Sequence, residues 1–190
     1  MYSGNNPTAL KSQRWLTEAL INLMQEIPYE KITIQLICKK AYLSRQTFYN
    51  FFSSKEDVLR FWLQEKYEEQ FSRFTTKPTM QDTIDAFIFV LNKNKQALTA
   101  LADNKLDGIV ADEMVKCVTK FAEKYVLQDK EMNDTLKCSI ILLAGAFAHL
   151  LIYCAGQQKK ISDCEISSLL KSFLLGELYE FGEDGAMEID

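Results

Sequence analysis

Glycine and proline are scarce in this chain of 190 residues, which contains seven glycines and three prolines. No glycine lies between Gly4 and Gly108, and the prolines stand only at Pro7, Pro28 and Pro78. Long stretches without these helix breakers, apolar residues at helical spacing and no alternating β-branched runs predict an all-α protein. The composition, 47% hydrophobic and 25% charged, is typical of a globular chain and excludes disordered and collagenous classes.

The sequence also lacks cysteine pairs at metal-binding spacing. Its five cysteines form no CxxC pair, so we expect buried, reduced thiols rather than disulfides or zinc ligands. The first residues, MYSGNNPTAL, lack the basic and apolar regions of a secretory signal, so a cytoplasmic protein is expected. No paired carboxylates, metal cluster or glycine-rich phosphate loop is visible. We therefore expect neither an enzyme nor a cofactor or metal site.

One long hydrophobic run is present, from Cys138 to Ala155. It carries no formal charge and reaches the lower limit of length for crossing a membrane. Ser139 and His149 interrupt it, and small residues around Gly145 favour close contact between helices. We therefore favour a core or dimer-interface helix, with no membrane partner, over a membrane span.

Charge is divided unevenly along the chain. The net charge is −4, but residues 1–60 hold eight Lys and Arg against five Asp and Glu, a net of +3, and residues 61–190 carry −7. A basic N-terminal unit beside a larger acidic one indicates a small domain that meets an anion, such as the phosphates of nucleic acid. We expect one domain over residues 1–60 and a second over 61–190, linked by a long helix over 54–75.

Residues 33–52 predict a helix-turn-helix. Thr33 and Ser44 are strong N-cap residues, each begins a short helix, and Tyr42-Leu43 forms the tight turn between the two helices. In such a motif the second helix lies in the major groove of DNA and presents its first turn to the base edges. The sequence therefore predicts double-stranded DNA as the partner of the N-terminal domain.

The side chains near the start of the second helix suit this task. Arg45 can pair with guanine O6 and N7, and Gln46 with adenine N6 and N7. Hydroxyl groups, a lysine and helix N-termini serve phosphate oxygens instead. The candidates for phosphate contact on this ground are Ser44, Thr47, Tyr49 and Lys55. Three phenylalanines between them are expected to form core: Phe48, Phe51 and Phe52.

The stretch from Thr33 to Leu59 resembles the DNA-binding motif of TetR-type transcriptional regulators. Its sequence is TIQLICKKAYLSRQTFYNFFSSKEDVL. The positions in register with that motif, without a gap, are Thr33, Ile37, Ala41, Ser44, Thr47, Tyr49, Phe52, Lys55 and Leu59. The resemblance implies phosphate contacts from Thr33, Thr47, Tyr49 and Lys55. It places Gln35, Arg45 and Gln46 where bases are read, with Asn50 suited to either role.

Tyr42 departs from the family pattern. The family prefers glycine at this turn because the residue often adopts a positive φ. A tyrosine in that conformation is expected to cost about 1 kcal/mol.

For the rest of the chain, the resemblance implies a ligand-sensing and dimerising domain. Its last two helices, here Lys137–Gln158 and Asp163–Phe181, would pair with their copies in a four-helix bundle. The resemblance then implies a homodimer that binds a palindromic operator sequence-specifically. It also implies that the protein represses transcription, as is usual in the family, and that a small-molecule effector releases it from DNA. The candidates for lining an effector pocket, or for plain core instead, are Trp62, Tyr67, Phe87, Phe121, Tyr125, Phe147 and His149.

Two alternatives keep DNA binding but change the signal. In the first, oxidation of one of the five cysteines would replace the effector. In the second, binding of a partner protein would replace the effector.

Overall fold

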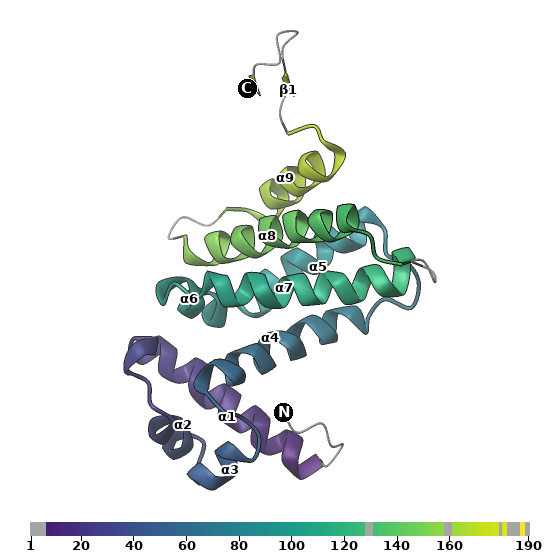
Figure 1. Ribbon diagram of the computed structural model, residues 1–190. Helices are drawn as coiled ribbons and strands as arrows, with labels where there is room; N and C mark the ends of the chain where they lie inside the picture. Colours follow the sequence, from purple (N-terminus) through teal and green to yellow (C-terminus); the bar gives the residue numbers. More distant parts are fainter. Residues whose placement is uncertain (1–6, 128–130, 158–160, 179, 182–186, 189–190) are drawn as a thin grey trace.

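The computed structural model describes residues 7–127, 131–157, 161–178, 180–181 and 187–188, and within them nine α-helices and one short antiparallel ribbon (Figure 1). The prediction of an all-α protein is confirmed. The helices are α1 (Pro7–Glu26), α2 (Ile34–Lys40), α3 (Arg45–Tyr49), α4 (Lys55–Phe71), α5 (Met80–Lys93), α6 (Lys95–Asp103), α7 (Asp107–Ala122), α8 (Asp134–Gly156) and α9 (Asp163–Leu175). The ribbon pairs β1 (Glu180–Phe181) with β2 (Met187–Glu188). A 3-10 turn (Tyr29–Lys31) follows α1, and a π turn (Glu123–Leu127) follows α7.

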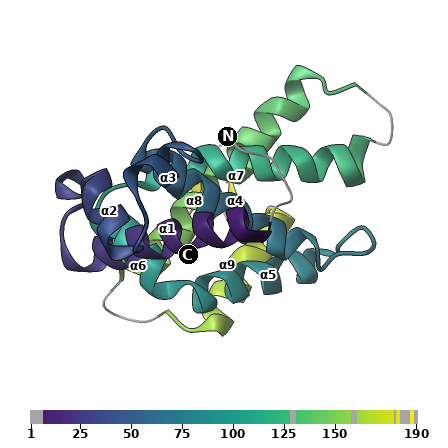
Figure 2. The same cartoon turned by 90° about the horizontal axis from the view of Figure 1, so that it is seen from below.

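The first three helices form a small bundle at one end of the molecule (Figures 1 and 2). Their starts follow the predicted caps: the Thr33 hydroxyl accepts a hydrogen bond from the Leu36 N–H at 3.2 Å, and Ser44 accepts one from Thr47 N–H at 3.0 Å. Asn6, which directly precedes α1 and is an N-cap residue by type, lies outside the described residues. Helix α3 ends at Tyr49 rather than at residue 52, because the chain tightens into a turn that leads into α4.

Helix α4 connects this bundle to the remaining helices (Figure 1). Ser54 and Asp57 form a capping box at its start, as the sequence predicts. The helix ends at Phe71, four residues before the predicted limit, where the N–H groups of Ser72 and Arg73 close the last turn on Glu68 and Gln70. One hydrophobic core runs from α1 through α4 to α8 and α9, so a displacement of α4 would be felt at both ends of the molecule.

Helix α8 contains the long uncharged run. One face packs on α6 and α7, and a Cβ added at Gly156 would come within 3.2 Å of Ala102 Cβ, which shows how closely α8 approaches α6. The opposite face is open: Leu142 is 75% exposed and Ile141 and Tyr153 are each 57% exposed. By length and composition α8 could cross a membrane, with a mean hydropathy of 2.1 over an 18-residue window. Of that window, 39% is buried inside the protein, and the remainder belongs to the open face.

Helix α9 is shorter than the sequence predicts. It ends at Leu175 because Gly176 adopts a left-handed conformation, with φ +74°, and the Glu177 N–H bonds Ser172 O at 2.8 Å. The predicted continuation to Phe181 is therefore wrong. Most of the acidic stretch after Gly182 lies outside the described residues.

The turn at Tyr42 has the backbone conformation that the family's glycine would serve. Tyr42 has φ +55° and its side chain is 95% exposed, so packing does not offset the strain. We expect Tyr42→Gly to raise the free energy of unfolding by about 0.5–1 kcal/mol, measured by urea denaturation. The matched control is Lys39→Gly in the neighbouring helix α2, which should lower it by a similar amount. Equal destabilisation by both would contradict the strain at Tyr42.

Candidate nucleic-acid interface and interior cavity

The recognition helix α3 is held in place by its aromatic side. Phe48 is fully buried, and its ring lies 5.9 Å from that of Phe52 and 5.5 Å, edge to face, from that of Tyr49. Phe52 is also buried and contacts Phe61 of α4, and Phe51 is half-buried. Burial of these rings turns the opposite side of α3 toward solvent.

The predicted base-reading side chains lie on the exposed surface of α2 and α3. Gln35, Arg45, Gln46 and Asn50 are all exposed. The Arg45 guanidinium lies 6.0 Å from the centre of the Tyr49 ring, at the outer limit of a cation–π contact, and makes no ion pair among the described residues. These side chains are therefore available to a ligand that covers this end of the molecule (Figure 2).

The predicted phosphate contacts fall into two groups. Thr33, Ser44 and Tyr49 are exposed, and Thr47 is half-buried, with its hydroxyl 2.9 Å from that of Ser44. The hydroxyls of Thr33 and Ser44 already accept hydrogen bonds from the first turns of α2 and α3. The Thr33 hydroxyl can still donate to a phosphate oxygen, because capping uses only its acceptor side, and one hydroxyl of the Ser44–Thr47 pair keeps its proton for the same purpose.

Lys55 is committed to the protein rather than free at the surface. Its Nζ donates to the carbonyls of Tyr29 at 2.6 Å and Ile32 at 3.0 Å, and lies 4.2 Å from the centre of the Tyr29 ring. Burial lowers the pKa of this ammonium, against the opposing charge of Glu30. These contacts connect α4 to the turn after α1. Because the Lys55 N–H groups already donate to backbone carbonyls, Lys55 would attract a phosphate mainly through its positive charge.

A cavity of about 410 Å³, partly open to solvent and called the interior cavity below, lies between helices α4, α5, α7, α8 and α9. Four of the predicted residues line it: Tyr67, Phe87, Phe121 and Phe147. The Phe87 and Phe147 rings meet edge to face at 5.6 Å across the α5–α8 contact. Of the lining residues that the structure describes, none is charged.

Three predicted pocket residues lie elsewhere. Trp62 lines a polar groove beside Arg14 of α1, because its side of α4 turns toward α1. The Tyr125 hydroxyl donates to Phe74 O at 2.9 Å within the turn after α7. His149 is exposed on α8, where Nδ1 lies 2.9 Å from Gly145 O and Nε2 lies 3.7 Å from Asp107. None of these three side chains lines this cavity: Trp62 and Tyr125 are buried, as the alternative of plain core expects, and His149 is exposed.

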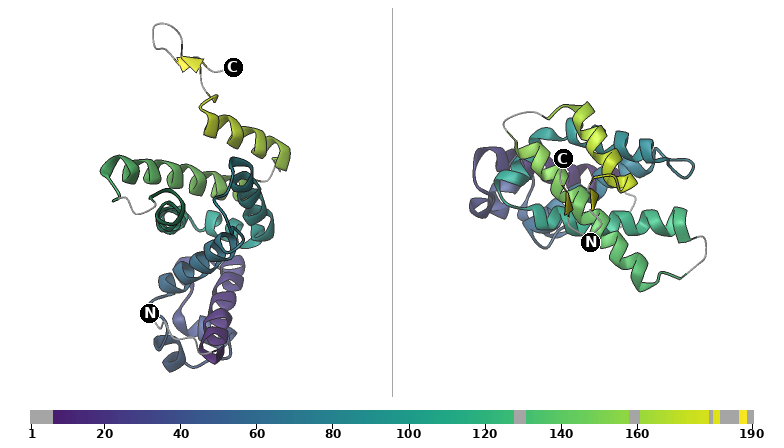
Figure 3. Two further views of the ribbon diagram at one scale, coloured as in Figure 1. Left: turned by 90° about the vertical axis from the view of Figure 1, so that its right-hand side faces the viewer. Right: turned by 90° about the horizontal axis from the view of Figure 1, so that it is seen from above.

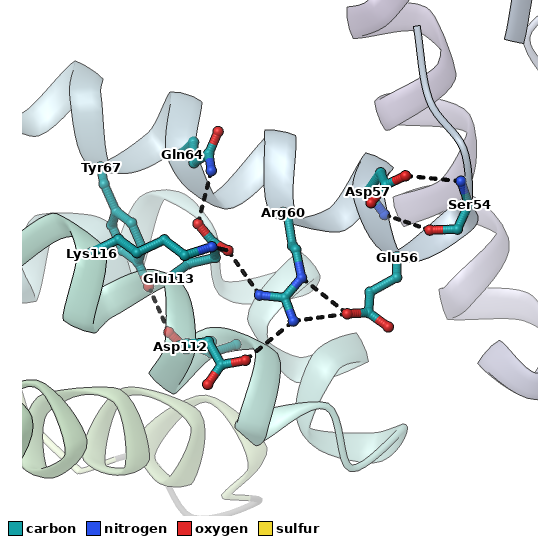
Figure 4. Close-up of polar contacts among 10 residues, drawn as sticks. Ser54, Glu56, Asp57, Arg60, Gln64, Tyr67, Asp112, Glu113 and Lys116 are labelled. Carbon is teal, nitrogen blue, oxygen red and sulfur yellow. Dashed lines mark hydrogen bonds and ion pairs between the residues drawn. The ribbon is translucent and has the colours of Figure 1, made fainter. Parts of the chain in front are cut away.

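A polar network joins α4 to α7 one to two turns from the cavity (Figure 4). The Glu113 carboxylate, 1% exposed, accepts hydrogen bonds from Arg60 at 2.8 Å, Gln64 at 2.9 Å and Lys116 at 2.6 Å. Burial raises the pKa of Glu113, but the hydrogen bonds from Lys116, Arg60 and Gln64 outweigh it and hold the pKa below its ordinary value. The same carboxylate raises the pKa of Arg60, so the pair stays ionised.

Tyr67 lines the cavity and lies on the same face of α4 as the residues of this network. Its hydroxyl donates to Val110 O of α7 at 3.4 Å, and Arg60, Gln64 and Tyr67 follow one another at helical spacing. A second link between the two ends of the molecule runs through Asn104, whose Oδ1 accepts from the Tyr29 N–H at 2.5 Å. Helix α4 therefore touches the cavity at one end and the helix-turn-helix at the other.

Sequence reasoning missed Gln70, Arg60 and Glu113. Gln70 lines the cavity and is 8% exposed, although glutamine ordinarily lies at the surface. Glu113 interrupts an apolar stripe of α7, and Arg60 lies seven residues before Tyr67 on α4. A polar residue within an apolar stripe is the sequence signal that could have indicated these positions. That Arg60 and Glu113 pair with each other is seen only from the packing of α4 on α7.

Comparisons with known proteins agree with this architecture. Residues 16–60 match the sequence model of a family described as bacterial regulatory proteins, tetR family. A curated relative from Lactococcus lactis subsp. lactis, the HTH-type dhaKLM operon transcriptional activator DhaS, is 25% identical over 126 residues, which are 59% of this chain and 67% of that protein. The match of the family model covers α2, α3 and all of the predicted DNA-contacting residues, from Thr33 to Lys55.

Solved structures resemble the fold over nearly its whole length. Lin0861 from Listeria innocua superposes with a TM-score of 0.75 at 16% identity, over 93% of this chain and 96% of that one. A TetR transcriptional regulator from Streptococcus agalactiae superposes with a TM-score of 0.55 at 23% identity, over 90% and 95% of the two chains. The arrangement of α4 to α9 behind the helix-turn-helix is therefore shared with other proteins.

Proposed function

We propose that this chain is a DNA-binding transcriptional regulator with the helix-turn-helix domain of the tetR family, and that it binds a palindromic operator as a homodimer. The observation that carries the proposal is the helix α3, which is fixed by buried Phe48 and exposes Arg45 and Gln46 at its start. Two such helices, related by a twofold axis, would enter successive major grooves about 34–36 Å apart. The domain of residues 1–60 would read DNA and that of 61–190 would regulate and dimerise.

Selection from a pool of randomised duplexes tests this proposal. We expect enrichment of two inverted half-sites whose centres lie about one helical turn apart. Enrichment of a single half-site, or of no sequence, would contradict dimeric operator binding.

The proposed dimer forms through α8 and α9. Together these helices expose large apolar side chains that a solvated surface does not require, at the end of the molecule away from α1–α3 (Figures 1 and 3): Ile141, Leu142, Tyr153, Leu169 and Phe173. Obligate dimer interfaces are apolar in this way. Cys138 and Cys164 are exposed on the same two helices, which corrects the prediction that the cysteines are mostly buried; only Cys38 is fully buried.

A charge on this face should weaken the dimer. We expect Leu142→Lys to raise the dimer dissociation constant about tenfold or more, measured by analytical ultracentrifugation, because an unpaired ammonium would have to be buried. Leu10→Lys is the control, since Leu10 is 37% exposed on α1 and lies outside the proposed interface. A dimer unchanged by Leu142→Lys would place the interface elsewhere.

We propose that a small-molecule effector enters the interior cavity and lowers the affinity for DNA. A ligand against Tyr67 would shift α4 against α7, and α4 carries the helix-turn-helix through Ser54 and Lys55. The two recognition helices of the dimer would then no longer match successive grooves. The chain would act in the cytoplasm, without a membrane partner and without catalysing a reaction.

Repression is the proposed sign of regulation, although the relative DhaS is named an activator. A promoter reporter in a strain with and without the gene decides between the two. Repression predicts a higher signal after deletion, and activation predicts a lower one.

Oxidation of a thiol is a weaker explanation of the signal. Burial raises the pKa of Cys38, Cys117 and Cys154, which keeps these thiols protonated and unreactive. Cys138 and Cys164 lie on the proposed dimer helices. If oxidation governed DNA binding, an oxidant would change the affinity of the wild type and not of a variant without cysteines. Control by a partner protein predicts instead that the purified chain binds its operator only after the partner is added.

A further inference from the structure

The interior cavity has almost no polar character, and this restricts what it can hold. Four of its lining residues carry a polar group: Tyr67, Gln70, Thr83 and Cys117. None of the described lining residues is charged, so a carboxylate or ammonium inside would be desolvated without a counter-charge. The lining therefore selects against ionised ligands.

Three of these polar groups offer little to a ligand, because two hydroxyls already donate hydrogen bonds to the protein and the Cys117 thiol stays protonated. The Tyr67 hydroxyl donates to Val110 O, and the Thr83 hydroxyl donates to Thr79 O at 3.1 Å. Burial raises the pKa of Tyr67 and that of Cys117, so both remain neutral. No negative charge develops in the cavity to attract a cation.

Gln70 is the exception. Its Oε1 is buried and has no hydrogen-bond partner among the described residues, although the side chain lines the cavity. Neither water nor a polar group of the described residues reaches this oxygen, so its missing hydrogen bond can be made only when the Gln70 amide turns toward the cavity and meets a donor on a ligand there.

We infer that the cavity binds an uncharged ligand with a hydrocarbon body and one hydrogen-bond donor, a hydroxyl or amide N–H, that pairs with Gln70 Oε1. A volume of about 410 Å³ lies at the small end of ligand pockets. At about 30 Å³ for each group the size of water, it holds roughly a dozen non-hydrogen atoms. The inference deepens the proposed effector binding and rests on it.

Three probes with the same number of non-hydrogen atoms separate the components of this inference: n-decanol, n-nonyl methyl ether and n-nonanoate. The alcohol is neutral and has a donor, the ether is neutral and has none, and the carboxylate is charged. Calorimetric titration of the DNA-free wild-type protein should show the alcohol bound about tenfold more tightly than the ether, and the carboxylate bound most weakly. Stronger binding of nonanoate, or no binding of any probe, would overturn the inference.

Two variants locate the effect. Gln70→Leu removes the unpaired acceptor at similar volume and should bind alcohol and ether equally, whereas Gln81→Leu, on the exposed side of α5, should keep the preference. Ala86→Trp should fill the cavity and abolish binding of all probes. A preference for the alcohol that survives in Gln70→Leu, or full binding by Ala86→Trp, would overturn the assignment.

The titration contains no DNA, so it is independent of operator binding. Adding n-decanol to the protein–DNA complex is a separate measurement. Binding of n-decanol without release of DNA would contradict the proposed effector mechanism and would leave the assigned ligand chemistry intact.

Discussion

Arg60→Met is expected to lower the free energy of unfolding by about 3 kcal/mol, measured by urea denaturation. The substitution leaves the Glu113 carboxylate, whose side chain is fully buried, without its guanidinium partner. Lys116 and Gln64 still bond Glu113, so the loss should fall at the lower end for breaking a buried ion pair.

The double variant Arg60→Met, Glu113→Leu should recover much of this loss, because replacing both members of a buried ion pair by apolar groups is often near neutral. Arg14→Met is the matched control, since its ion pair with Glu65 is largely exposed and should be worth less than about 1 kcal/mol. A double variant no more stable than Arg60→Met would contradict the view that the buried carboxylate causes the loss.

The same network has a pH signature. Because the pKa of Glu113 is lowered in the folded state, its contribution to stability is fully present above the unfolded-state pKa. The contribution is lost as the pH falls through the folded-state pKa, in the acid range. Glu113→Gln should therefore flatten the decline of stability with acid relative to the wild type.

Arg45→Ala is expected to weaken binding to the selected operator by about tenfold to a hundredfold, the range for losing one bidentate contact to a base. The loss should be specific: affinity for unrelated duplexes should fall much less, because phosphate contacts supply that binding. Arg73→Ala is the control of equal charge. Arg73 lies beyond the far end of α4, with its guanidinium 3.8 Å from the centre of the Phe89 ring. Equal effects of the two substitutions would show that Arg45 acts only through net charge.

The N-terminal domain could be predicted from sequence because its signals are local. Thr33, Ser44 and the pair Ser54–Asp57 cap helices through bonds to residues three positions along, and such bonds depend only on the neighbouring sequence. The positive φ of Tyr42 followed from the family pattern for the same reason. The predicted DNA contacts remain predictions, although the structure exposes most of them.

The regulatory domain was less predictable because its cavity depends on how helices rotate against one another. Tyr67 and Trp62 lie on the same helix, yet one lines the cavity and the other faces α1. His149 lies within an apolar run, but its side chain is exposed beside the start of α7, 3.7 Å from Asp107, and not toward the cavity. The end of α9 could not be predicted because apolar residues continue at helical spacing beyond Gly176, and only the structure shows that this glycine adopts the left-handed conformation that ends the helix.

The central claim is that α3 reads the sequence of DNA, and a fluorescence titration tests it most directly. Wild-type protein and Arg45→Ala are titrated against the selected duplex and a permuted duplex of equal composition, at several salt concentrations. Wild type is expected to prefer the selected duplex by about a thousandfold or more. Its binding should also weaken steeply with salt, and Arg45→Ala should reduce the preference. Equal, weak binding of the wild type to both duplexes would contradict this claim.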